Sequence, residues 1–184
     1  GSASGSGRPG EFRPERLAGV LQQVADEANW RSRPRVRGRG MGIGAYFCHL
    51  GYSAAVAEVS VDDQNRIRVH KVWMVTDVGR QIINPSGARA QAEGAILEGM
   101  GHMMVEVTLA EGRAEQTNFP QYHWPRIQQT PEMQISWRIT DNSPTGLGEP
   151  ALPAVLPAIG NAVFAATGKR IRTLPLARSG FSMA

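Results

Sequence analysis

The sequence has very little cysteine and no long apolar run. Its single cysteine, Cys48, excludes an internal disulfide, a four-cysteine zinc site and an iron–sulfur cluster held by this chain alone. The most apolar stretch, Ala151 to Thr167, is interrupted by prolines, a glycine and an asparagine, and it falls short of the roughly 18 residues that a membrane-spanning helix needs. We therefore expect a globular chain without a membrane span.

Signatures of several common enzyme classes are also missing. The sequence has no Gly-x-Ser-x-Gly elbow, so a serine hydrolase finds no support. Alternating glycines between Gly38 and Gly44 precede no helix and lack the spacing of a dinucleotide fingerprint, which argues against a Rossmann fold. The histidines have neither the helical nor the paired spacing of a zinc site. They are His49, His70, His102 and His123.

The net charge of +4 comes entirely from the first 40 residues, which hold eight arginines and four acids. Five of these arginines alternate from Arg31 to Arg39, and an extended segment would present all five on one face, where phosphates could bind. We favour a solvated segment that leads into a strand, because no RNA-binding signature, helix-turn-helix pattern or interleaved aromatic residue accompanies the arginines.

The hydrophobic pattern predicts an α+β fold in which antiparallel or mixed strands pack against two long helices and an N-terminal helix. Residues 1–12 are rich in glycine and serine and are interpreted as a flexible linker or an expression remnant. Leu17, Val20, Leu21 and Val24 follow helical spacing and predict the amphipathic N-terminal helix over Pro14 to Asn29.

The strands are expected after this helix. β-rich runs at Ala54–Val61 and Ile67–Thr76 flank a turn sequence, which makes Ser53–Thr76 a predicted antiparallel hairpin. Residues Glu132–Thr140 alternate apolar and polar side chains and predict a further strand. Two shorter strands are predicted at Val105–Leu109 and Glu115–Phe119.

Two longer helices complete the expected fold. Asn84 and Pro85 suit the cap and the first position of a helix over Ser86 to Val107. A last helix is expected to end at Gly168, a residue typical of the position after a helix. Its predicted buried face consists of Leu152, Val155, Leu156, Ile159, Val163 and Ala166.

One face of the helix that follows Pro85 is polar and rich in glycine. It carries residues spaced alternately by four and three positions, namely Gly87, Gln91, Gly94, Glu98 and Gly101. Each interior glycine costs up to about 1 kcal/mol relative to alanine, so we expect something to approach this face closely. The sequence leaves open whether that is another helix or a cofactor whose oxygens meet the Gln91 amide.

The segment Thr145–Pro150 places one carboxylate, Glu149, between two glycines and a proline, directly before the last helix. Glycines allow a sharp turn and close approach to a ligand, whereas Pro150 fixes the backbone, so Glu149 is expected to be held in one place. Two interpretations remain at this point. Glu149 is either a functional carboxylate or an acid that sits at the positive end of the following helix.

Taken in order, these motifs resemble those of a known family. They are Asp77-x-Gly79, Asn84-Pro85, Gln91-x-Glu93-Gly94-Ala95, Gly99-x-Gly101 and Gly146-x-Gly148-Glu149-Pro150, followed by an apolar helix. The chain resembles the C-terminal part of the molybdenum-binding subunit of the xanthine dehydrogenase and aldehyde oxidase family. Within that family it is most similar to isoquinoline 1-oxidoreductase and related bacterial aldehyde dehydrogenases. The resemblance covers about Arg16 to Leu176 and assigns 13–176 to a molybdopterin-binding domain, with 177–184 as a tail.

The resemblance implies a function for the motif residues. Glu149 is expected to be the general base in a reaction that oxidises an aldehyde or an N-heterocycle with oxygen from water. Gln91 and Gly94 are expected to bind the pterin, and Gly146, Leu147 and Gly148 to form the loop that closes on the metal. The implied cofactor is molybdopterin in its cytosine dinucleotide form. The implied partners are the remainder of the molybdenum subunit and an iron–sulfur subunit, in a bacterial cytoplasm or periplasm.

The chain is much shorter than the usual molybdenum subunit and lacks the cofactor loops that precede this region in the family. We therefore expect a piece that neither retains the cofactor nor turns over substrate on its own. A non-catalytic interaction module, which could also self-associate, is the alternative from another class. A basic nucleic-acid binder that uses the arginines from Arg31 to Arg39 is a third hypothesis.

Overall fold

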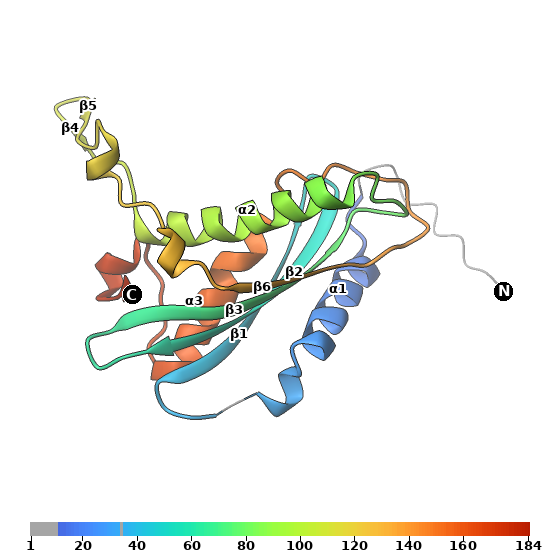
Figure 1. Ribbon diagram of the computed structural model, residues 1–184, viewed down its shortest axis with the longest axis horizontal. Coiled ribbons are helices and arrows are strands. Elements are labelled where there is room, and N and C mark those ends of the chain that lie inside the picture. The colour runs from blue at the N-terminus through green and yellow to red at the C-terminus, as the bar shows by residue number, and fades with distance from the viewer. Residues whose placement is uncertain (1–10, 34) are drawn as a thin grey trace.

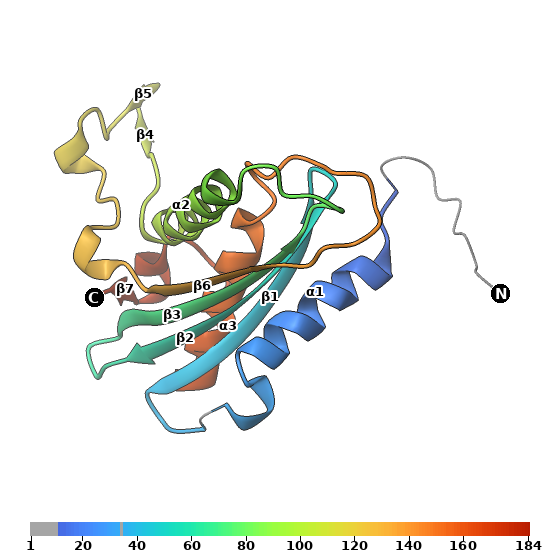
Figure 2. The same cartoon turned by 45° about the vertical axis from the view of Figure 1, so that its right-hand side comes forward.

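The computed structural model describes residues 11–33 and 35–184. Within these ranges the chain forms three layers, with a mixed sheet between helices (Figures 1 and 2). The helices are α1 (Pro14–Glu27), α2 (Pro85–Met104) and α3 (Val155–Thr167). The strands are β1 (Arg39–Cys48), β2 (Gly51–Val61), β3 (Arg66–Asp77), β4 (Leu109–Ala110), β5 (Arg113–Ala114), β6 (Glu132–Trp137) and β7 (Ser182–Met183). The predicted α+β class is confirmed.

The main sheet has the order β1-β2-β3-β6, with β7 also pairing with β3. The first three strands are antiparallel, whereas β6 and β7 run parallel to β3. The predicted hairpin is present as β2 and β3. Its turn is stabilised by Asp62, whose Oδ1 accepts the backbone N–H groups of Gln64 and Arg66 at 2.9 Å each.

Helix α1 covers one face of the sheet, and α2 and α3 cover the other (Figures 1 and 2). Because side chains alternate along a strand, β2 supplies both cores. Tyr52, Ala54 and Val56 pack under α1, while Ala57 and Val59 pack under the other two helices. No helix among the described residues is both long and apolar enough to cross a membrane.

The alternating glycines of β1 allow α3 to lie directly on the strand. A Cβ atom at Gly40 or Gly42 would collide with the α3 backbone, and one at Gly44 would lie 2.6 Å from the carbonyl oxygen of Ala154. Helix α3 presents small residues such as Ala158 to this surface. The glycine pattern therefore serves helix-on-sheet packing rather than nucleotide binding.

The ends of the two longer helices agree with their predicted caps. The Asn84 side chain accepts the Gly87 N–H at 3.0 Å, and Pro85 stands in the first turn of α2. Helix α3 ends at Gly168, which has φ of 75°. Of the predicted buried face of α3, Leu152 and Leu156 are only partly buried, and Leu152 lies in a preceding 3-10 turn.

The segment 105–131, here called the arm, projects beyond the end of α2 (Figures 1 and 2). Its predicted strands were wrong in position and extent. Strand β4 overlaps the predicted Val105–Leu109 only at Leu109, and β5 ends before the predicted Glu115–Phe119 begins. Glu111 and Gly112 form a two-residue turn with φ of 52° and 76°. Strands β4 and β5 therefore pair directly beside this turn. The strand predicted over Glu132–Thr140 ends at Trp137, so Ile139 is exposed.

Residues near both chain ends pack against the rest of the fold. Residues 177–184, predicted to be a tail, add β7 to the sheet, and Phe181 is buried in the core. Most of the predicted linker, residues 1–10, lies outside the described residues. Phe12, the last residue of that linker, has its ring 5.5 Å from the ring of Phe47 and 6.0 Å from that of Tyr52.

Candidate functional site

A cavity of about 470 Å³ lies between α2, the β1–β2 turn and the loop before α3. Its volume falls in the range of pockets that hold cofactors or drug-sized ligands, about 300–1,000 Å³. The cavity combines apolar walls with carboxylates, an amide and a thiol. Its lining residues are Cys48, Ala90, Gln91, Gly94, Ala95, Glu98, Gly148, Glu149, Leu152 and Pro153.

Glu149 lies in a loop that is fixed on both sides. Upstream, the Thr145 N–H donates to the carbonyl oxygen of Val78 at 2.9 Å. Downstream, the buried Pro150 packs on Gly51, where a Cβ atom would lie 2.8 Å from the proline ring. The Glu149 carboxylate itself is exposed and makes no hydrogen bond or ion pair within the described residues. It is therefore available to a ligand in the cavity.

The polar face of α2 divides between two neighbours. Gln91, Gly94 and Glu98 face the cavity, and a Cβ atom at Gly94 would meet nothing within 4 Å. At Gly101, in contrast, a Cβ atom would lie 2.5 Å from the Trp124 ring. The arm therefore fills one end of the glycine face, while the other end stays open to the cavity.

The predicted site residues are only partly brought together. Gln91, Gly94, Gly148 and Glu149 line the same cavity, but Gly146 and Leu147 do not line it. The roles predicted for all six remain predictions.

Sequence reasoning missed Cys48, which also lines the cavity and whose Sγ lies 2.9 Å from His49 Nδ1. The β1–β2 hairpin brings Cys48 to the cavity wall through a two-residue turn at His49 and Leu50. Both turn residues have positive φ, 48° and 65°. The turn residues of such hairpins are normally glycine or asparagine, so the sequence carried no signal for this wall.

The charged side chains that line the cavity are both acidic, because Glu98 and Glu149 line it and none of its lining residues is a lysine or arginine. Two groups of the β2–β3 hairpin have a shifted pKa. Partial burial lowers the pKa of His70, which hydrogen-bonds Ser60 at 2.7 Å. Hydrogen bonds from Arg66 lower the pKa of the exposed Asp62.

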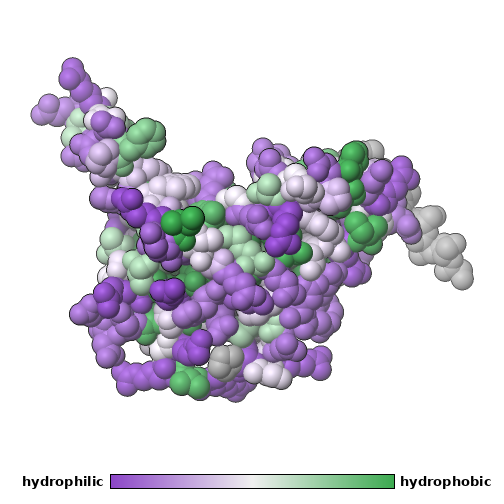
Figure 3. Space-filling model, viewed as in Figure 1, coloured by the Kyte–Doolittle hydropathy of each residue, from purple (hydrophilic) through white to green (hydrophobic). Residues whose placement is uncertain are grey.

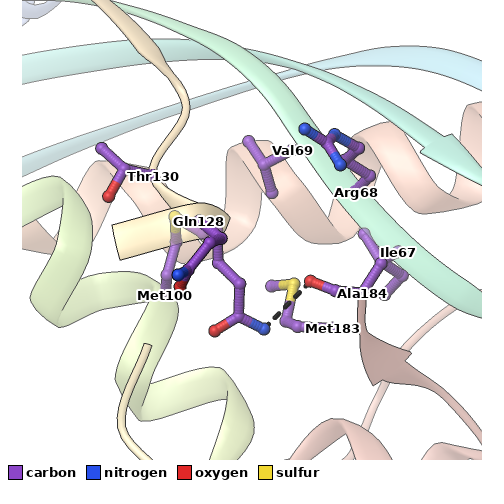
Figure 4. Close-up of a pocket in the computed structure, with 9 residues that line it drawn as sticks. Ile67, Arg68, Val69, Met100, Gln128, Thr130, Met183 and Ala184 are labelled. Carbon is purple, nitrogen blue, oxygen red and sulfur yellow. Dashed lines mark hydrogen bonds between the residues drawn. The ribbon is translucent and has the colours of Figure 1, made fainter. Parts of the chain in front are cut away.

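Other hollows fit a cofactor less well. One of about 690 Å³ has lining of mixed charge, including Arg37, Asp62 and Lys169, and contains none of the motif residues. Figure 4 shows a hollow of about 20 Å³, which has room for a single water molecule. Two of its lining residues are joined by a hydrogen bond, in which the Gln129 amide nitrogen donates to the carbonyl oxygen of Ala184 at 3.0 Å. On the face shown in Figure 3, apolar patches are small and separated by polar side chains.

The residues of the 470 Å³ cavity fit an organic cofactor that brings its own metal ligands. The described residues contain no cluster of three or more histidine, cysteine or acidic side chains that could hold a metal ion directly. Gln91 can both donate and accept hydrogen bonds, and the two carboxylates can accept them from ring N–H groups. Gly94 and Gly148 leave open space for a flat ring system.

Fold and cavity together define a cofactor-binding domain of mixed α and β structure. Comparison with known proteins identifies the cofactor class, because the profile of the molybdopterin cofactor-binding domain matches residues 9–131. The chain belongs to this family.

Two curated relatives match almost the whole chain. The isoquinoline 1-oxidoreductase subunit beta of Brevundimonas diminuta is 33% identical over 88% of this chain and 21% of its own length. A membrane-bound aldehyde dehydrogenase (pyrroloquinoline-quinone) of Gluconacetobacter polyoxogenes is 34% identical over 94% of this chain and 24% of its own. The chain thus spans about a fifth to a quarter of the length of these relatives.

Solved structures agree with this assignment. Quinoline 2-oxidoreductase from Pseudomonas putida 86 has a TM-score of 0.61 and 25% identity, over 68% of this chain and 17% of that chain. The aldehyde oxidoreductase from Desulfovibrio gigas has a TM-score of 0.60 and 26% identity, over 68% and 14% respectively. The predicted family is confirmed.

Proposed function

We propose that this chain forms one wall of the active site of a molybdenum hydroxylase that oxidises aldehydes or N-heterocycles. The observation that carries the proposal is the shared cavity. It joins the polar face of α2, with Gln91 and Gly94, to the loop that carries Glu149. These are the motif residues to which the family resemblance assigns cofactor binding and base catalysis.

Each of these residues has a task that its chemistry suits. The Gln91 amide holds the edge of the cofactor through hydrogen bonds, while Gly94 and Gly148 let it approach the backbone. When bound, the molybdenum cofactor supplies the two-electron redox centre for oxidation with oxygen from water. The Glu149 carboxylate accepts a proton at one of its oxygens during this reaction. Gly146 and Leu147 do not line the cavity, and the family resemblance assigns them to the same loop as Glu149.

The proposal extends to partners and cofactor form. The chain is part of a longer molybdenum subunit that works with an iron–sulfur subunit, and it retains no cofactor when isolated. The cofactor is the cytosine dinucleotide form of molybdopterin. The name of the Gluconacetobacter relative specifies a different cofactor, the organic compound pyrroloquinoline-quinone. Metal analysis of the full-length protein separates these two cofactors.

An association role is the second candidate, and the arm supports it. Several large apolar side chains of the arm are exposed, among them Leu109 at 73%, Phe119 at 92% and Ile127 at 84%. The base of the arm is held by the packing of Trp124 on Gly101. We propose that these side chains contact the remainder of the molybdenum subunit rather than solvent.

Substitution of Gly94 by leucine in the full-length protein tests the cofactor site. The new side chain points into open space in the cavity and replaces a helical glycine, so stability should rise by up to about 1 kcal/mol. Cofactor affinity should fall by on the order of tenfold or more, because the side chain occupies cofactor volume. The measurements are molybdenum content, released pterin and melting temperature.

The matched control is Gly160→Leu, which places the same side chain in open space on α3, away from the cavity. The control should retain the parent's molybdenum. Parent-level molybdenum in Gly94→Leu would rule out this cavity as the cofactor site, and bound quinone without molybdenum would replace the proposed cofactor.

A further inference from the structure

A charged group is buried at the end of β3, next to the loop that carries Glu149. The Asp77 side chain has no exposed surface, and its carboxylate receives two bonds from Arg16: Nε donates to Oδ2 at 2.8 Å, and a terminal nitrogen donates to Oδ1 at 2.6 Å. The backbone N–H of Gly79 and the hydroxyl of Thr140 also donate to Oδ1, at 2.9 and 3.1 Å. This carboxylate therefore connects three separate parts of the chain.

Arg16 reaches this carboxylate from α1, on the sheet face opposite the cavity. Its guanidinium lies 4.4 Å from the centre of the Tyr52 ring, and its side chain is only 10% exposed. The Tyr52 hydroxyl in turn accepts the N–H of Arg13 at 2.8 Å. The Arg16 side chain is thus held in a fixed orientation by its packing on Tyr52 as well as by its ion pair with Asp77.

After the end of β3, the Asp77 carboxylate orients residues 78–80, the segment that supports the loop carrying Glu149. Gly79 has φ of 101°, and a Cβ atom there would lie 2.5 Å from the carbonyl oxygen of Ser143. The Arg80 N–H donates to the carbonyl oxygen of Asn142 at 3.0 Å, and the Thr145 N–H donates to that of Val78 at 2.9 Å. Residues 78–80 and 140–145 therefore form one closely packed unit that begins at Asp77.

We infer that Arg16 is a positioning residue for Glu149, acting through Asp77 and the paired segments 78–80 and 140–145. The inference rests on the proposed function of Glu149, because only a reacting carboxylate requires this placement. Removing the guanidinium leaves a buried carboxylate without its partner, which favours local opening that exposes Asp77 to water. The upstream anchor of the loop at Thr145 is then lost while Pro150 stays packed on Gly51.

Amide hydrogen exchange of the 184-residue chain tests the inference in three variants. In Arg16→Met, the Thr145 and Arg80 amides should exchange on the order of tenfold faster or more, relative to core amides of β2. Arg16→Lys keeps the charge and should recover part of this protection, although it cannot form both bonds. Gln22→Met introduces the same methionine side chain at an exposed position of α1 and should leave both amides unchanged.

A general loss of stability would raise the exchange rates of the Thr145 amide and of the β2 core amides together. The ratio of these two rates therefore reports only the local loosening of the segment that positions Glu149. If Arg16→Met leaves this ratio at the parent value, or if the lysine variant behaves like the methionine variant, the inference is overturned. This readout uses cofactor-free protein, so it can fail independently of the proposed function.

Discussion

Replacement of Glu149 by glutamine in the full-length, molybdenum-loaded protein is expected to lower turnover by about 10²- to 10⁴-fold. Glutamine has nearly the same size and keeps an acceptor oxygen, but it cannot take up a proton. The side chain makes no hydrogen bond or ion pair within the described residues, so the substitution breaks no internal contact. Steady-state kinetics together with metal analysis measures the effect, and molybdenum content should equal that of the parent.

Glu132→Gln is the matched control for this variant. Its carboxylate is exposed, pairs with Lys71 at 2.6 Å and lies on β6, outside the cavity lining. Turnover should stay within about twofold of the parent, because exposed ion pairs contribute little to stability. Normal turnover in Glu149→Gln would remove the base from the proposed mechanism, whereas loss of molybdenum would indicate a binding role instead.

Gly42→Val is expected to destabilise the fold by about 3 kcal/mol or more, the upper end of overpacking effects. A Cβ atom at Gly42 would collide with the backbone N–H of Ala162 and the carbonyl oxygen of Ala158, and would lie 2.6 Å from the Asn161 carbonyl carbon. Backbone atoms cannot move aside as a flexible side chain can, so α3 must lift from the sheet. Urea or thermal unfolding of the 184-residue chain measures the change.

The control for this effect is Gly160→Ala, on the same helix. A Cβ atom at Gly160 meets nothing within 4 Å, so this change should stabilise α3 by up to about 1 kcal/mol. Equal stability of Gly42→Val and the parent would contradict the packing of α3 on β1. Because Leu152 and Pro153 precede α3 and line the cavity, a displaced helix should also distort the site.

The parts of the structure with local sequence signals were predictable. The Asn84 cap, the hairpin turn at Asp62 and the αL residue Gly168 each have a residue type that suits only a few backbone conformations. For the glycine face of α2 and for the turn at Glu149, the sequence left open either a ligand or a purely structural role, and the structure places both beside one cavity. That these two segments meet at one cavity depends on tertiary packing, which the local sequence does not specify.

Contacts between residues far apart in the sequence could not be predicted. Arg16 and Asp77 are 61 positions apart, and nothing in either local sequence indicates a buried ion pair. The packing of Trp124 on Gly101 depends on how the irregular arm folds back on α2. The third wall of the cavity, at Cys48, depends on a hairpin turn without glycine at its positive-φ positions.

Thiol labelling of Cys48 in the full-length protein tests the central claim most directly, because this side chain lines the same cavity as Gln91 and Glu149. The labelled peptide is identified by mass spectrometry, so other cysteines do not interfere. With the cofactor bound, labelling should be on the order of tenfold slower or more than after cofactor removal, since the cofactor covers the cavity wall. Equal rates with and without cofactor would contradict the assignment of this cavity.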